Sequence, residues 1–155
     1  MTDGPTLPEG MHQLSPHLVC RDANAAIDFY VRAFDAKELM RLPGPDGKIM
    51  HASVVINGSS VMLVDENLEW GLRSPLDLGG TPVTIHLVVA DADAVYARAV
   101  EAGATASMPV AEQFWGDRYG VLHDPFGHAW SIASPIGQPK TVEELAAAAK
   151  RAGSA

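Results

Sequence analysis

The chain has 155 residues, of which 47% are hydrophobic and 19% charged, as is typical of one soluble globular domain. Its net charge of −8 disfavours nucleic acid and anionic membrane surfaces as partners, and no stretch approaches the roughly 20 apolar residues of a membrane span. The single cysteine, Cys20, excludes an internal disulfide, and residues 1–13 lack a signal-peptide pattern, so we expect a cytoplasmic protein.

The first part of the chain has the pattern of one strand, one helix and three further strands. Residues 1–13, with two prolines and no periodicity, are expected to form a flexible arm. A first module then occupies residues 14–66, with turns predicted at residues 43–47 and at Asn57–Gly58. The predicted elements are a strand over 14–21, a helix over 24–34, and strands over 37–42, 49–56 and 60–65.

The side-chain pattern assigns faces to the first two elements. Asn24 is the predicted N-cap of the helix. The apolar stripe of that helix consists of Ala26, Ile27, Tyr30, Val31 and Phe34. In the first strand, Leu18 and Cys20 point to one side, while Ser15, His17 and Val19 point to the other. We therefore expect Leu18 and Cys20 to pack under the helix, with Cys20 as an inert buried thiol.

A linker over residues 67–82 precedes a second module over residues 83–135 with the same order of elements. Its predicted elements are a strand over 83–89, a helix over 91–103 with Gly103 as C-cap, and strands over 105–110, 118–123 and 129–133. A capping box of Thr141 and Glu144 opens a C-terminal helix over 141–152. The weak stripe of that helix, formed by Val142, Leu145 and Ala149, favours packing on the outside of the domain or on a partner subunit.

The two modules are copies of one unit. A shift of 69 residues, the interval from Asp22 to Asp91, also superimposes His17 on His86 and Gly58 on Gly127. The sequence therefore predicts an α+β fold of two tandem βαβββ modules, each of which needs the other to bury its apolar surface. We expect the functional site between their two sheets.

Three motifs carry a resemblance to a known family: Ile27–Tyr30 (IDFY), Trp115–Gly120 (WGDRYG) and Asp124–Trp130 (DPFGHAW). Together with the duplication, they resemble the vicinal oxygen chelate superfamily, which contains glyoxalase I, extradiol dioxygenases and bleomycin-resistance proteins. The last two motifs are most similar to its PhnB-like branch. The resemblance covers about residues 14–134 and implies that each module forms a curved mixed sheet, a half-barrel, with a metal held between the two in catalytic members.

The resemblance also implies where the metal ligands of those members would fall. The first strands place them at Ser15 and Thr84, and the last strands at Met62 and Ser131. None of these side chains is a good ligand for a divalent metal in such a site. We therefore expect no metal cofactor at the usual position.

His17 and His86 are the strongest alternative ligands. Each lies two residues beyond a family ligand position, so each shares the inward face of its strand. Two imidazoles can hold Zn, Ni or Fe if Asp65, Glu66 or His51 supplies a third ligand. We favour the other interpretation, in which both are polar groups lining a pocket.

The Trp115–Tyr119 loop is expected at the mouth of that pocket. Trp115 and Tyr119 can stack on a flat ligand, although Trp115 fits a structural role equally well. Arg118 can bind an anion, but we favour an ion pair with Asp117 or Asp124. Three other residues are expected outside the site: His128 in a turn, Trp130 in the core, and His12 without a role.

These patterns favour a metal-free relative that binds a small apolar or aromatic molecule in the cavity between its sheets. The expected lining residues are Ser15, His17, Met62, Thr84, His86, Trp115, Tyr119 and Ser131. The alternative is a metal-dependent lyase or dioxygenase with a displaced site at His17 and His86, and a third possibility is a fold without a cavity ligand. Unpaired sheet edges and the resemblance together predict a homodimer.

Overall fold

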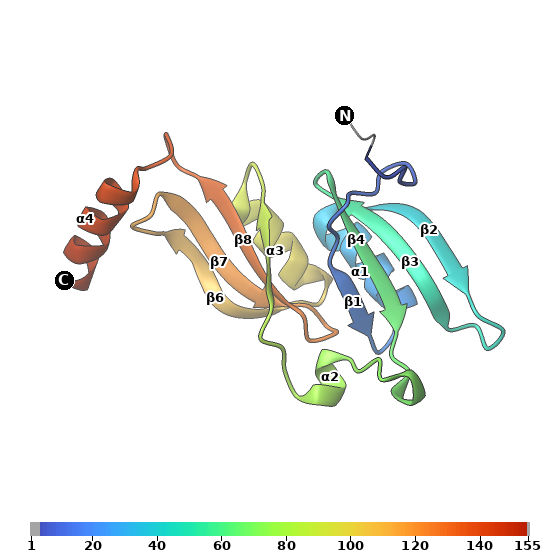
Figure 1. The fold of residues 1–155 in the computed structure, drawn as a ribbon. Coiled ribbons are helices and arrows are strands. Elements are labelled where there is room, and N and C mark those ends of the chain that lie inside the picture. Colours follow the sequence, from blue (N-terminus) through green and yellow to red (C-terminus); the bar gives the residue numbers. More distant parts are fainter. Residues whose placement is uncertain (1–3, 155) are drawn as a thin grey trace. The chain divides into compact units, whose positions relative to one another are not determined.

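A computed structural model describes residues 4–154 and divides them between two compact units (Figure 1). The first unit extends to Thr81 and includes residues 125–127, and the second comprises residues 82–124 and the chain from His128 onward. Each unit has one four-stranded mixed sheet with a helix on one face. The predicted α+β class and the C-terminal helix are confirmed.

The first unit has the strand order β1-β4-β3-β2, in which β1 runs parallel to β4 and the other pairs are antiparallel. Helix α1 contacts all four strands. The long elements are β1 (His17–Cys20), α1 (Ala23–Phe34), β2 (Lys37–Pro43), β3 (Ile49–Ile56) and β4 (Ser59–Asp65). Two short helices, η1 (Leu68–Trp70) and α2 (Pro75–Leu78), lie in the segment that the sequence predicts as a plain linker.

The second unit repeats this topology with the order β5-β8-β7-β6. Its elements are β5 (Thr84–Val88), α3 (Ala92–Ala102), β6 (Thr105–Glu112), β7 (Asp117–His123), β8 (Ala129–Pro135) and the C-terminal α4 (Val142–Gly153). The register is repeated as well. His17 lies opposite Met62 in the first sheet, and His86 lies opposite Ser131 in the second. These pairs are related by the 69-residue shift, so the duplication extends to the pairing of individual residues.

The starts of the two main helices are also duplicated. Asp22 caps α1 by accepting a hydrogen bond from the Ala25 N–H, and Asp91 caps α3 through the Ala94 N–H. The predicted cap, Asn24, is wrong. Asn24 lies inside the first turn and accepts a hydrogen bond from Arg41 Nη1 instead, because the extended backbone that a cap requires occurs at Asp22.

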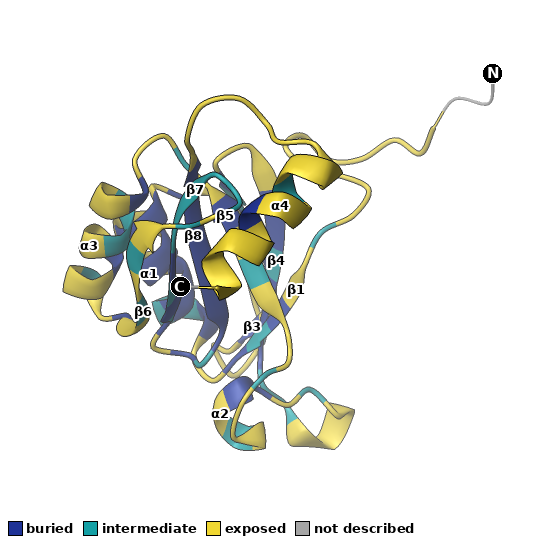
Figure 2. Cartoon of the chain, turned by 90° about the vertical axis from the view of Figure 1, so that its left-hand side faces the viewer, coloured by how far each residue is buried: buried dark blue, intermediate teal, exposed yellow. Residues whose placement is uncertain are grey.

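The face of each sheet under its helix forms the core. In the first unit, Leu18 and Cys20 are buried there, as predicted. In the second unit, the largest fully buried side chains are Trp130, Leu122 and Ile132. Strands β3, β4 and β8 are mostly buried, and α4 is mostly exposed, as the dark blue of β8 and the yellow of α4 in Figure 2 show. Val31, predicted in the core stripe of α1, is 40% exposed, because it lies at the edge of the helix face that packs on the sheet.

Several element ends differ from the prediction. Strand β1 begins at His17 rather than Leu14, since Pro16 has no N–H to donate, although its carbonyl still accepts a hydrogen bond from the Met62 N–H. The capping box of Thr141 and Glu144 is confirmed. In the predicted stripe of α4, Leu145 is half-buried and Val142 is exposed, and the buried alanine is Ala148 rather than Ala149. Among residues 4–154, no helix combines the length and apolarity needed to cross a membrane.

Candidate functional site

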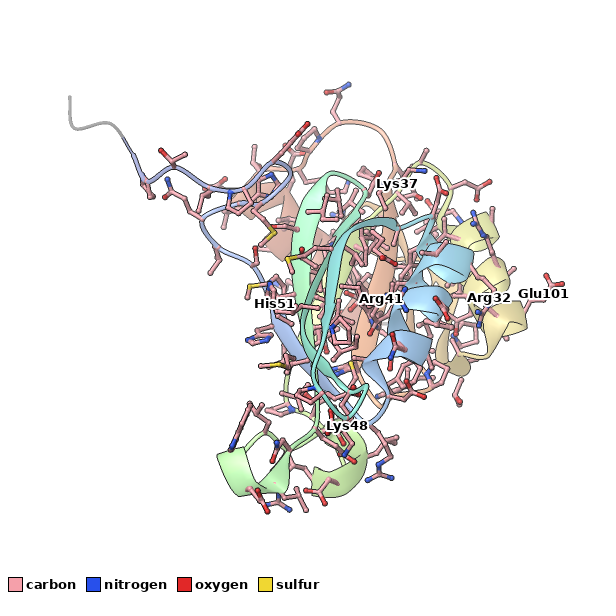
Figure 3. The ribbon with its side chains drawn as sticks, turned by 90° about the vertical axis from the view of Figure 1, so that its right-hand side faces the viewer. Arg32, Lys37, Arg41, Lys48, His51 and Glu101 are labelled. Atoms are coloured by element: carbon pink, nitrogen blue, oxygen red, sulfur yellow. The ribbon has the colours of Figure 1, made fainter. Side chains whose placement is uncertain are left out.

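We call the face of each sheet that points away from its helix the inner face. In the first unit, the inner face carries His17 and Met62 on paired positions of β1 and β4, with His51 on β3. Figure 3 shows His51 on the side of the sheet opposite α1, whereas Arg41 lies on the side of that helix. The alternation predicted from sequence therefore places His17 and Met62 as expected.

A hollow of about 470 Å³, here called the inner hollow, opens on this face. The sheet contributes apolar and polar side chains to it: Leu39, Met40, His51, Ser53 and Met62. The segment before β1 contributes the others, including Met11, His12 and Ser15. Of the predicted site residues, Ser15 and Met62 line this hollow. Three methionines give it an adaptable apolar wall.

A cluster of hydrogen bonds joins the segment before β1 to the start of β4. Ser60 is buried, and its Oγ lies 2.5 Å from Ser15 Oγ and accepts a hydrogen bond from the His12 N–H at 3.0 Å. The Ser60 N–H donates to His12 Nδ1 over a longer 3.5 Å. Sequence reasoning gave no role to His12 or Ser60. Alternation from Met62 could have placed Ser60 on the inner face, but nothing in the local sequence pairs it with His12.

His17 and His51 form a pair of imidazoles on the inner face. Their ring centroids are 6.3 Å apart, with the rings nearly perpendicular. Burial lowers the pKa of His17 below its ordinary value of 6.5, and the charge that His51 can carry lowers it further. Both effects favour a neutral His17 ring, which can donate and accept hydrogen bonds to a bound molecule.

The second unit brings together His86, Ser131 and Tyr119. His86 Nδ1 lies 2.7 Å from Ser131 Oγ, and the imidazole stacks on the Tyr119 ring at a centroid distance of 6.1 Å. Ser131 is only 2% exposed, so this hydrogen bond satisfies a buried hydroxyl. With Nδ1 engaged, Nε2 is the atom of His86 that can meet a ligand. Thr84 lies on the same face, two residues before His86.

The turn between β6 and β7 adds two more aromatic rings. Trp115 packs edge-on against Tyr119 at 5.2 Å and contacts Phe114 at 5.1 Å. The indole N–H of Trp115 donates to Asp117 Oδ2 at 3.0 Å, which fixes the ring within the turn. His86, Tyr119 and Trp115 therefore form one continuous row of rings. Trp130 belongs to the core, as predicted, and donates to Asp124.

Arg118 forms an ion pair, as favoured from sequence, but with a different partner. Its Nε and Nη2 donate to the two carboxylate oxygens of Asp93 at 2.6 and 2.9 Å. The predicted partners are wrong because Asp117 and Asp124 are engaged by tryptophan N–H groups. Asp93 lies in the first turn of α3, which no local pattern around Arg118 could reveal.

The four family metal positions do not fit a divalent metal. Ser15 and Ser131 already share their hydroxyls with Ser60 and His86, Met62 offers only a thioether, and Thr84 offers a neutral hydroxyl. Across residues 4–154, no three His, Cys, Asp or Glu side chains gather closely enough to hold a metal ion.

The carboxylates considered as extra ligands for His17 are also occupied. Asp65 is buried and accepts hydrogen bonds from the N–H groups of Ala23 and Ile49. Glu66 bonds Arg21 and Ser74, and these bonds lower its pKa despite partial desolvation. Both carboxylates border a second hollow of about 360 Å³, lined from residues 44–50 and 64–70. His51 is thus the group beside His17 on the inner face.

Comparison with known proteins agrees with this architecture. A family model described as the Glyoxalase/Bleomycin resistance protein/Dioxygenase superfamily matches residues 10–132. A Mycobacterium bovis protein, Mb0911c, described as uncharacterized, is 55% identical over 143 residues, which cover 90% of this chain and 93% of the relative.

Solved structures show the same fold. TioX from Micromonospora sp. ML1 has 28% sequence identity and a TM-score of 0.65, over 81% of this chain and 99% of that chain. A PhnB protein from Bacillus cereus, at 18% identity, is similar in fold, with a TM-score of 0.62 over 79% of this chain and 99% of that chain. With its duplicated βαβββ units and a family match over most of its length, this chain belongs to the glyoxalase/bleomycin resistance protein/dioxygenase superfamily.

Proposed function

We propose that this protein is a metal-independent member of the superfamily that binds a small apolar or aromatic molecule on the inner faces of its sheets. The observation that carries the proposal is the inner hollow, whose size is within the range of small-molecule sites. Its lining combines methionine and leucine side chains with a few polar groups, as such sites do. The buried position of the single Cys20 suits a reducing compartment, and we place the protein in the cytoplasm.

The second unit supports the same proposal with a different surface. The row of His86, Tyr119 and Trp115 offers aromatic faces and one imidazole nitrogen. A flat molecule can stack on such a row and take a single hydrogen bond from the imidazole. That the two inner faces contribute to one site stays a prediction.

The second candidate function is a metal-dependent lyase or dioxygenase. The sequence predicts a displaced metal site at His17 and His86 for this function, and the observation that favours it is the imidazole pair of His17 and His51. Two imidazoles are sufficient for weak metal binding, but a stable site needs a further ligand. We therefore rank this function second.

Titration with Nile red, an uncharged aromatic dye whose fluorescence rises in apolar surroundings, tests the proposal. We expect saturable binding with an unchanged Kd in EDTA. Met40→Ala removes part of the wall of the inner hollow and should raise Kd about tenfold, since losing about 1.4 kcal/mol of apolar contact has that effect. Met50→Ala is the matched control, because Met50 is similarly exposed on the neighbouring strand but lies outside this hollow.

Two results would contradict the proposal. One is the absence of saturable dye binding by the wild-type protein. The other is stoichiometric Zn, Ni or Fe retained through gel filtration and detected by elemental analysis, which would favour the metal-dependent function.

A further inference from the structure

The segment before β1 forms a large part of the inner hollow. Its lining residues are Leu7, Pro8, Glu9, Met11, His12, Gln13, Leu14 and Ser15. Strands β2, β3 and β4 of the same unit contribute fewer residues to the lining than this segment does. Without the segment, the inner face of the sheet around Met40 and Met62 would lack its opposite wall. The arm is thus a structural part of the hollow rather than a neighbour of it.

Specific contacts hold this segment in place. The backbone N–H of His12 donates to the buried Ser60 Oγ, and the Ser60 N–H returns a longer hydrogen bond to His12 Nδ1. Ser15 adds a hydroxyl contact to the same Ser60 oxygen. Three bonds that converge on one serine join the arm to the first residues of β4. We call this cluster the Ser60 clasp.

Gly10 lets the arm approach the sheet closely. Its φ of +84° belongs to the left-handed region, and a Cβ there would lie 3.0 Å from both terminal methyl groups of Leu39. Leu39 itself lines the inner hollow. The positive φ of Gly10 and its close approach to Leu39 bring the arm against β2. The Ser60 clasp joins the arm to β4, on the opposite side of the hollow.

The chemistry of the arm determines which molecules fit. Leu7, Met11 and Leu14 present apolar surface to the hollow. Glu9 is the one formally charged side chain among the described lining residues. A bound anion would be repelled by this carboxylate, whereas an uncharged or cationic apolar molecule would not. The lining of the hollow therefore favours apolar ligands without negative charge.

We propose that residues 7–14 are part of the binding site, that the Ser60 clasp holds them there, and that they select uncharged or cationic apolar ligands over anionic ones. This inference rests on the proposed function, since it assigns a ligand class and a specificity element to the same hollow.

Two dyes and paired variants test the inference. The dyes are Nile red, which is uncharged, and 1-anilinonaphthalene-8-sulfonate, which is anionic. Met11→Ala, in the arm, should raise the Kd for Nile red at least fivefold, whereas Met50→Ala should leave it unchanged. A chain that begins at residue 14 should show a larger loss. If that shortened chain does not fold cooperatively, the Kd of Met11→Ala for Nile red decides whether the arm contributes to the site.

The charge preference has its own pair of variants. Glu9→Gln should lower the Kd for the anionic dye about two- to threefold at low salt and leave that for Nile red unchanged, as expected for one exposed charge. Glu69→Gln, an exposed glutamate outside the hollow, is the control.

The possible failures are distinguishable. If the wild-type protein binds Nile red and neither Met11→Ala nor the shortened chain changes the Kd, the arm is not part of the site and the proposed function stands. If the wild-type protein binds no Nile red, both the inference and the proposed function are overturned. Rapid hydrogen exchange of the Ser60 and His12 amides in the wild-type protein would overturn the clasp.

Discussion

At the scale of single residues, the two copies of the module have diverged where a ligand would bind. The second copy pairs His86 with Ser131 through a hydrogen bond. In the first copy, His17 is paired with Met62, whose side chain has no N–H or O–H to donate. The backbone register is conserved between the copies, but the partner of the histidine is a buried hydroxyl in one copy and an adaptable thioether in the other.

This difference predicts unequal effects of equivalent substitutions. His86→Ala removes the partner of the buried Ser131 hydroxyl and should lower the free energy of unfolding by about 1–3 kcal/mol. The repeat-related change His17→Ala leaves no buried hydroxyl without its partner, since His17 lies opposite Met62, and should cost less than about 0.5 kcal/mol. Urea unfolding of both variants measures the difference, and equal losses would contradict it. His86→Ala should also weaken binding of an aromatic ligand.

The His17–His51 pair predicts a dependence on pH. The pKa of His17 in the folded protein lies below the unfolded value of 6.5, so the unfolded chain binds the proton more readily. The stability that neutral His17 contributes is present above pH 6.5 and is lost as the pH falls through the folded-state pKa. NMR titration should give His17 a pKa below 6.5. In His51→Ala this pKa should rise only part of the way, because burial is the larger cause. An unchanged value would contradict the coupling.

At the scale of elements, each main helix starts at an aspartate in the same repeat position. Asp22 and Asp91 have nearly identical extended backbones and bond the N–H three residues further on. The N–H group of the next residue has a different acceptor in each unit. The Ala23 N–H donates to Asp65, and the equivalent Ala92 N–H donates to Ser134. A carboxylate and a hydroxyl thus fill the same position at the ends of β4 and β8.

The duplicated caps predict matched energetic effects. Asp22→Ala and Asp91→Ala should each destabilise the protein by about 1 kcal/mol, because each leaves a first-turn N–H without its acceptor. Asp22→Asn should retain most of the stability, since asparagine caps about as well. Thermal unfolding followed by circular dichroism measures these changes. An Asp22→Ala variant as stable as wild type would contradict the cap.

At the scale of the whole molecule, the two sheets suggest an assembly. Each four-stranded sheet has two outer strands, which are β1 and β2 in the first and β5 and β6 in the second. Apolar side chains on these strands, including Leu42 and Val88, are nearly half exposed. Open edges with apolar surface favour pairing with another chain, and closed two-fold pairing is the usual outcome.

We therefore predict a homodimer in solution. Multi-angle light scattering after gel filtration should give twice the mass of the chain at micromolar concentration. A monomer mass under these conditions would contradict the prediction. Replacing Leu42 by Lys on the outer strand β2 should shift the equilibrium toward monomer if that edge takes part, because a desolvated lysine opposes edge pairing.

The fold could be predicted from sequence because its signals are local and repeated. Alternation in β1 assigned Leu18 and Cys20 to the core, Asn57–Gly58 marked the β3–β4 hairpin, and the 69-residue shift predicted that the second module repeats the first. Such features depend on the period of a strand or on the φ preference of a turn residue, and both are written in neighbouring residues.

The site depended on contacts between residues far apart in the chain. The sequence by itself determined the duplicated modules and the faces of His17 and His86, and it has Ser15, Met62, Thr84 and Ser131 where the resemblance implies the family's metal ligands. The tertiary structure alone decided that Arg118 pairs with Asp93 and that His12 bonds Ser60. It also decided that the arm forms a wall of the inner hollow. These pairings carry no local signal, because packing rather than chain proximity selects the partner of an exposed charge or an irregular segment.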